Sequence, residues 1–168
     1  MTERARLWIC NDFLPVYRVG GWSWLLAHRG QTTGAAGGER ATTAARSALS
    51  GLTAGLRALA ASDPACAALA VRIETSSPDL ASCAAHLTRL GGAPGEDDPI
   101  DNLDLWAQIS AAAKGRKLSL IHARAAPSTP LSFAAAWAEL ARDKAKATGP
   151  FIAAIPRSNL AKAPGLPP

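Results

Sequence analysis

Short apolar stretches with turn residues between them dominate the first forty residues. Residues 5–13 are predicted to form a first strand that ends before Pro15, and residues 19–28 a second. Arg29-Gly30-Gln31 then predicts a hairpin turn into a weaker third strand. Glycines near residues 34–38 leave the end of that third strand undefined.

A leucine stripe follows this strand-forming region. Leu49, Leu52, Leu56 and Leu59 recur at three- and four-residue spacing, which is typical of the buried face of a helix. The pair Thr42-Thr43 supplies hydroxyls that cap such a helix, so we expect it to run to about residue 60.

The remaining elements alternate between strand and helix patterns. We expect a strand at 67–76, a helix from 77 to 91, a helix from 102 to 113, a strand at 117–122 and a helix at about 131–147. The order, hairpins first and crossovers later, predicts a mixed sheet covered by helices.

The last segment, 148–168, differs in composition because it holds five of the twelve prolines. We therefore expect a domain over 1–147 and a proline-rich C-terminal tail over 148–168 that runs along the surface.

Composition adds constraints on the core and on location. Hydrophobic residues make up 48% of the chain, but many are alanines, so large side chains must anchor the core. We expect the five tryptophans to do this: Trp8, Trp22, Trp24, Trp106 and Trp137. The apolar runs are short for a membrane span, and the N-terminus lacks a signal-peptide layout, so we expect a cytoplasmic protein with no membrane partner.

The net charge of +5 is unevenly distributed. Residues 1–60 carry +4, residues 61–113 carry −6 and residues 114–168 carry +7. This pattern is compatible with nucleic acid on one surface, although a solvated surface would also account for it. The three cysteines and three histidines lack the spacing of a zinc site, so no such metal is expected.

Several segments resemble the type 1 ribonuclease H family, in the order and at nearly the spacing of that family. The matching segments are Gly20-Gly21-Trp22, Arg29-Gly30, Thr42-Thr43-x-x-Arg46-x-x-Leu49, Asn102-x-Asp104-Leu105-Trp106 and Glu139-Leu140-Ala141-Arg142. The resemblance covers residues 5 to 147. It implies an α/β fold of the ribonuclease H type, in which three antiparallel strands and two parallel strands form a five-stranded mixed sheet flanked by helices.

The family's chemistry depends on four carboxylates that hold two Mg²⁺ ions and so activate water against an RNA phosphodiester. Carried over from the family's motifs, these positions fall on Cys10, Ala48, Ser76 and Ala138. Neutral side chains do not hold a hard dication. We therefore expect no catalytic residues at these positions, no bound metal and no cofactor.

Relocated acids are the alternative, with Mg²⁺ as the cofactor. Asp12 lies two residues after Cys10 and Glu74 two residues before Ser76. The resemblance implies that their strands are parallel neighbours, so the two acids should lie about 13 Å apart. Glu139 is rotated by about 100° from Ala138 around its helix. Surface or strand-end charges account better for all three. The hypothesis that Cys10 is a nucleophile with His122 as its base is also weaker than the hypothesis that Cys10 is a buried, inert thiol.

Contacts to nucleic acid are predicted at Thr43, Arg46, Trp106 and Arg124. The resemblance places Thr43 and Arg46 beside a phosphate pocket and Arg124 near the family's mobile histidine. A capping role for Thr43 and core packing for Trp106 are the competing interpretations. The region where the family often has a basic substrate handle carries Glu96, Asp97 and Asp98 here, which would repel phosphates.

Three hypotheses follow. The first is a catalytically inactive ribonuclease H-like protein that acts as a nucleic-acid-binding or assembly module, with RNA–DNA hybrid or other nucleic acid as its partner. The second is a divergent metal-dependent ribonuclease H that cleaves the RNA strand of hybrids with relocated acids. The third is a protein–protein interaction or structural module.

Overall fold

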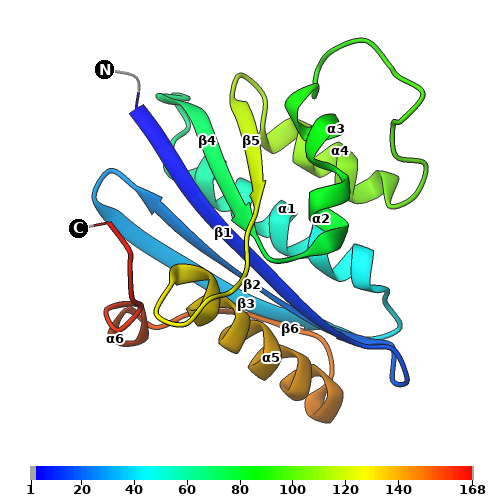
Figure 1. The fold of residues 1–168 in the computed structure, drawn as a ribbon, viewed down its shortest axis with the longest axis vertical. Helices are drawn as coiled ribbons and strands as arrows, with labels where there is room; N and C mark the ends of the chain where they lie inside the picture. The colour runs from blue at the N-terminus through cyan, green and yellow to red at the C-terminus, as the bar shows by residue number, and fades with distance from the viewer. Residues whose placement is uncertain (1–2, 168) are drawn as a thin grey trace.

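The computed structural model describes residues 3–167. It contains one mixed sheet with helices on both faces (Figure 1). The strands are β1 (Glu3–Leu14), β2 (Val19–His28), β3 (Gln31–Glu39), β4 (Ala68–Thr75), β5 (Lys117–His122) and β6 (Phe151–Ala154). Their order across the sheet is β5-β4-β1-β2-β3-β6.

The sheet combines a hairpin half with a crossover half. β1 pairs antiparallel with β2, and β2 with β3, through two tight connections. β4 pairs parallel with β1, and β5 parallel with β4, through crossovers that contain helices. The predicted α/β class and the mixed sheet are confirmed, with six strands in the described chain rather than five.

The sixth strand comes from the segment 148–168, which we expected to be a surface tail. Phe151–Ala154 pairs antiparallel with β3, from Gly38↔Phe151 to Ala35↔Ala154. Ile155 and Leu160 then become buried. The sequence signal was weak because four residues after Gly149-Pro150 show no alternation. The strand forms because β3 offers it an unpaired edge.

Three helices are long: α1 (Ala44–Ser62), α4 (Leu103–Ala112) and α5 (Pro130–Thr148). Three are short: α2 (Pro78–Ser82), α3 (Ala84–Thr88) and α6 (Arg157–Leu160). The single helix expected from 77 to 91 is therefore wrong, because the backbone breaks at Cys83 with ψ near 0°. The break still leaves Leu80 and Leu87 buried.

Hydrophobic residues form a core on each face of the sheet. The leucine stripe of α1 packs with Leu7 and Ile9 on one face, together with α4. Ala134 and Ala138 of α5 pack with Trp8 and Cys10 on the other. Of the five tryptophans expected to anchor the core, four are buried (Trp8, Trp22, Trp24 and Trp106), and Trp137 is partly buried.

Glycines let α5 lie directly on the sheet. A Cβ atom on Gly21 of β2 would overlap the backbone of Ala138 and Arg142, and one on Gly38 of β3 would overlap the Cβ of Ala145. The glycines that blurred the predicted end of the third strand thus lie within β3. Only glycine, which has no Cβ, permits this close approach of helix to strand.

Among the described residues, no helix combines the length and the apolar character that crossing a membrane would require.

Candidate functional site

Cys10 lies in β1 and Ser76 directly after β4, on neighbouring parallel strands. The Cys10 thiol lies 3.4 Å from the Ser76 hydroxyl and donates to the carbonyl oxygen of Leu131 at 3.4 Å. Burial raises the pKa of the thiol above its ordinary value, against a smaller lowering by its hydrogen bond with Ser76. Cys10 is therefore a protonated, packed group rather than a metal-binding thiolate.

Ala48 and Ala138, the other two positions implied by the resemblance, are both fully buried. Ala48 belongs to the core between α1 and the sheet. Ala138, a residue of α5, packs in the core with Cys10 of β1. Each methyl group contributes to packing and offers no ligand.

These four residues do not fit the Mg²⁺ ions that the fold implies. A thiol, a hydroxyl and two methyl groups lack the carboxylate oxygens that Mg²⁺ requires. Across the part of the chain that the structure describes, no cluster of three His, Cys, Asp or Glu residues is placed to hold a metal ion.

The alternative acids have other partners. Asp12 accepts a hydrogen bond from Arg142 of α5. Glu74 accepts one from the indole N–H of Trp8 at 2.6 Å and ion pairs with Arg6 and Arg72.

The strand register also separates two of these acids. Trp8 stands opposite Glu74, and Asp12 lies four residues further along β1, about 13 Å away. Glu139 is 62% exposed and 3.8 Å from Arg142. The structure therefore does not bring Asp12 and Glu74 together.

Thr43 and Arg46 lie at the start of α1. Thr43 is the N-cap, and its hydroxyl accepts from the backbone N–H of Arg46 at 3.1 Å. The Arg46 guanidinium donates to both carboxylate oxygens of Asp104, at 2.7 and 3.0 Å, and to Asn102. This hydrogen bond lowers the pKa of Asp104 to about 2. A phosphate contact by Arg46 must therefore compete with Asp104.

Asn102 lies in the matched segment that enters the later helix. It occupies the N-cap position of α4 in a left-handed conformation and makes no side-chain capping bond. Its side-chain oxygen accepts instead from Arg46. The starts of α1 and α4 are thereby tied together.

Trp106 and Arg124 differ in accessibility. Trp106 is 6% exposed, and its ring packs edge-on against His86 with centroids 4.7 Å apart. It is not presented for stacking on a base, which corrects that expectation. Arg124 is exposed, two residues after His122, whose Nε2 lies 3.3 Å from the carbonyl oxygen of Ser76. The thiol of Cys10 pairs with Ser76 and Leu131, which leaves no Cys10–His122 hydrogen bond.

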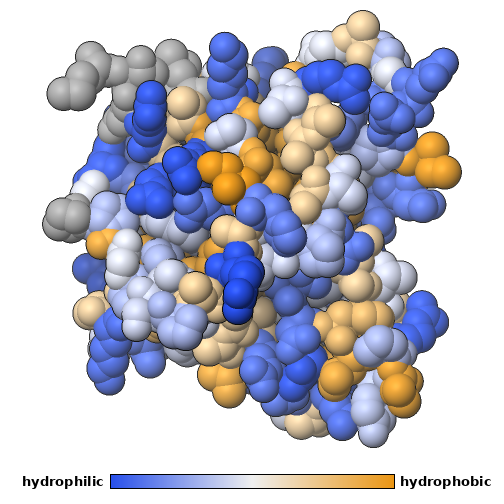
Figure 2. All heavy atoms as spheres, in the orientation of Figure 1, coloured by the Kyte–Doolittle hydropathy of each residue, from blue (hydrophilic) through white to orange (hydrophobic). Residues whose placement is uncertain are grey.

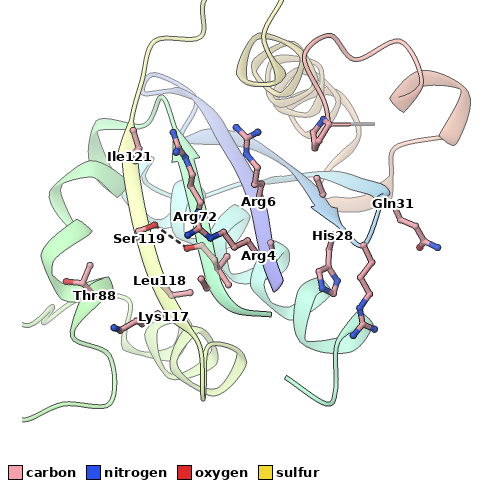
Figure 3. A pocket seen from close by; sticks show the side chains of 17 residues that line it. Arg4, Arg6, His28, Gln31, Arg72, Thr88, Lys117, Leu118, Ser119 and Ile121 are labelled. Atoms are coloured by element: carbon pink, nitrogen blue, oxygen red, sulfur yellow. Dashed lines mark hydrogen bonds between the residues drawn. The ribbon is translucent and has the colours of Figure 1, made fainter. Parts of the chain in front are cut away.

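The sequence analysis did not predict a basic hollow of about 900 Å³, which lies toward the end of the strands away from Cys10. Arg4 and Arg6 of β1, Arg72 of β4 and Lys117 of β5 line it (Figure 3). Its sequence signal was cations at alternate positions of a strand, which point to one face of the sheet. These cations form one surface only when three strands are aligned.

No family model and no curated protein matches the sequence. Solved structures do match. A ribonuclease H1 obtained from compost by a metagenomic approach, solved in complex with an RNA/DNA hybrid, has 16% identity and a TM-score of 0.62, covering 84% of this chain and 99% of that one.

Two further structures extend the similarity. The N-terminal ribonuclease H domain of a Mycobacterium tuberculosis protein, fused to maltose-binding protein, has 16% identity and a TM-score of 0.59, covering 87% of this chain and 98% of that one. Ribonuclease H1 of Halobacterium salinarum has 21% identity and a TM-score of 0.52, covering 84% and 98%. At such identities the similarity concerns architecture, and the chain has the fold of the type 1 ribonucleases H.

Proposed function

We propose that this protein is a ribonuclease H-like module that binds nucleic acid without cleaving it. The observation that carries the proposal is the buried, hydrogen-bonded thiol of Cys10, at a position where the resemblance implies a metal-binding aspartate. The fully buried Ala48 and Ala138 and the half-buried Ser76 are the neutral residues at the other three such positions. Without carboxylates near one another, two metal ions have no ligands that would hold them for phosphodiester hydrolysis.

Neutral residues at these four positions avoid a repulsion that carboxylates would create. Clustered carboxylates repel one another unless a metal ion balances them. The thiol–hydroxyl contact between Cys10 and Ser76, the Ala138 methyl group of α5 and the Ala48 methyl group of α1 cause no such repulsion. The fold is thereby stabilised in a form that does not depend on bound metal.

Binding is supported by fold and by charge. The compost ribonuclease H1 with the same fold was solved in complex with an RNA/DNA hybrid. This chain keeps an excess of positive charge in residues 1–60 and 114–168, which favours a polyanionic partner. RNA–DNA hybrid is accordingly the first ligand to test.

The test measures binding and cleavage of one labelled RNA–DNA hybrid, with Mg²⁺, with Mn²⁺ and with chelator. We expect a mobility shift that does not require metal, and no cleavage in any condition. The variants Asp12→Asn and Glu74→Gln serve as controls for relocated catalysis. Cleavage that needs metal and disappears in either variant would establish the alternative, a divergent ribonuclease H.

Absence of both binding and cleavage would overturn the proposal in a different way. Protein–protein interaction would then be the remaining hypothesis, and the acidic segment 96–101 would be the first surface to probe. Binding affinity must be compared at one fixed salt concentration, because nucleic-acid affinity depends steeply on salt.

A further inference from the structure

Part of the sheet carries no long helix on the α5 side. α5 packs on β1, β2 and β3, and its axis lies over that half of the sheet (Figure 1). The first half of β1, with β4 and β5, forms the floor of the basic hollow described above. Figure 2 shows hydrophilic residues gathered over this end of the sheet, beside a small hydrophobic area.

The strand register orders the cations of the basic hollow in two rows. In the first row Lys117 stands beside Ala70, and Ala70 beside Arg4. In the second row Ser119 stands beside Arg72, and Arg72 beside Arg6. The rows are two residues apart, about 7 Å, and the flanking strands β5 and β1 are about 10 Å apart.

The cations of the basic hollow outnumber the described carboxylates that pair with them. Glu74, the acid beside the second row, pairs with both Arg6 and Arg72 at 3.5 and 3.0 Å. Arg4 and Lys117 are exposed and form no ion pair with any side chain that the structure describes. Among the described residues, Glu74 is the carboxylate that pairs with any of these four cations, and Arg29, which also lines the hollow, pairs with Asp63. Clustered cations in a concave surface attract anions.

The floor between the cations is small and apolar. Ala70 separates Lys117 from Arg4, and Ala27 of β2, which stands beside Arg6, also lines the hollow. Ile121 of β5 is 38% exposed at the rim. Such a floor accommodates a sugar or a base, while the cations at its sides reach the phosphates.

The spacing of the cations fits the backbone of a single strand. Cations about 7 Å apart along β1 match the separation of successive phosphates in an extended nucleic-acid strand. Across the sheet, the cations of β5 and β1 lie about 10 Å apart, with β4 between them. The alternation of cationic and apolar groups resembles the grooves that track a single backbone.

We propose that the basic hollow binds the phosphodiester backbone of a single nucleic-acid strand. It lies about 13 Å from Cys10, because Arg6 precedes Cys10 by four residues in β1. The inference rests on the proposed function only in requiring that the protein bind nucleic acid, and it assigns that binding to a second place on the sheet.

The experiment compares the wild-type chain with the double variant Arg4→Gln/Lys117→Gln. Both side chains are exposed and make no ion pair with a described residue, so the variant should fold normally, as thermal unfolding would verify. The matched control is Arg57→Gln/Lys114→Gln, which removes one arginine and one lysine elsewhere on the surface. The probes are a labelled oligouridylate and a labelled RNA–DNA hybrid, titrated at several salt concentrations.

We expect the Arg4/Lys117 variant to weaken oligouridylate binding at least tenfold and the control to weaken it less than threefold. Its dependence of log affinity on log salt should become less steep by about 1.4, since each lost single-strand phosphate contact removes about 0.7. Equal affinity of the Arg4/Lys117 variant and the wild type for oligouridylate would overturn the inference. If the wild type still bound the hybrid, the proposed function would stand.

Three other outcomes are also decisive. Equal losses in the variant and the control would show a diffuse charge effect and would overturn a specific site. A wild-type chain that binds neither probe would overturn both proposals together. Competition by inorganic polyphosphate as strong as that by oligouridylate, per phosphate, would reassign the hollow to phosphate chains in general and overturn the nucleic-acid strand as its ligand.

Discussion

The thiol of Cys10 lies 3.4 Å from the hydroxyl of Ser76, and this contact joins β1 to the end of β4. The two residues are 66 positions apart in the chain, and parallel pairing of their strands brings them together. Both side chains are neutral, and Cys10 is fully buried. Substitution of Cys10 therefore tests what this contact contributes.

Replacing Cys10 by Asp should destabilise the protein. A carboxylate there would be buried beside Leu131 without a cationic partner, and an uncompensated buried charge costs about 3 kcal/mol. Urea denaturation at neutral pH measures the change. Cys10→Ala is the control and should cost less, because it removes only the sulfur. A Cys10→Asp protein whose Tm rises with Mg²⁺ would contradict our interpretation, since a ligand of the folded state stabilises it.

Acid should destabilise the protein through Asp63, which ends α1 and is 1% exposed. The hydrogen bond from Arg116 and the backbone N–H of Ala68 hold the pKa of Asp63 well below its usual value of about 3.9. Because the folded-state pKa is lowered, its stabilisation is present above about pH 4 and is lost as the pH falls further.

This acid dependence is measured by urea unfolding between neutral pH and pH 3. The variant Asp63→Asn should be less stable at neutral pH and should show a smaller loss below pH 4. Asp104→Asn is the comparison, since Asp104 pairs with Arg46 at an exposed site. An unchanged acid slope in Asp63→Asn would show that other groups control the acid response.

Arg46 and Asp104 should have opposite effects on nucleic-acid binding if Arg46 contacts a phosphate. Asp104→Asn releases the guanidinium from its bidentate partner and should tighten hybrid binding. Arg46→Gln should weaken it by about fivefold, equivalent to roughly 1 kcal/mol. Fluorescence anisotropy at fixed salt measures both. Parallel effects of the two variants would indicate that the pair only ties α1 to α4.

Trp106 should matter for stability rather than for binding. Its ring is buried against His86, so Trp106→Ala should cost about 3–5 kcal/mol, the usual range for removing a buried aromatic ring. Hybrid affinity per folded molecule should stay within twofold of wild type. A selective loss of affinity in a fully folded variant would restore the stacking role for this residue.

A chain that ends at residue 147 should be less stable than the full chain by about 3 to 6 kcal/mol. It would lose the pairing of β6 with β3 and the burial of Ile155 and Leu160, each worth about 1.5–3 kcal/mol. Thermal unfolding of both chains gives the difference. A truncated chain as stable as the full one would support an independent domain over 1–147.

Local pattern was sufficient to predict the long elements. The strands 19–28 and 117–122, and the helix that begins after Thr43, follow from alternation, from the leucine stripe and from a cap, all of which act within a few residues. The ordered motifs also pointed to the fold, because conformational rules for turns and helix starts are local. The prediction that the family's carboxylate positions fall on Cys10, Ala48, Ser76 and Ala138 likewise rests on residue identity.

Only the tertiary structure decided what depends on distant neighbours. β6 exists because β3 offers an edge, and the basic hollow exists because three strands align cations that lie apart in sequence. The burial of Trp106 and the ion pair between Arg46 and Asp104 could not be predicted from the sequence for the same reason. Burial, ion pairing and edge pairing are set by which segments meet, and a single residue's neighbours along the chain do not determine that.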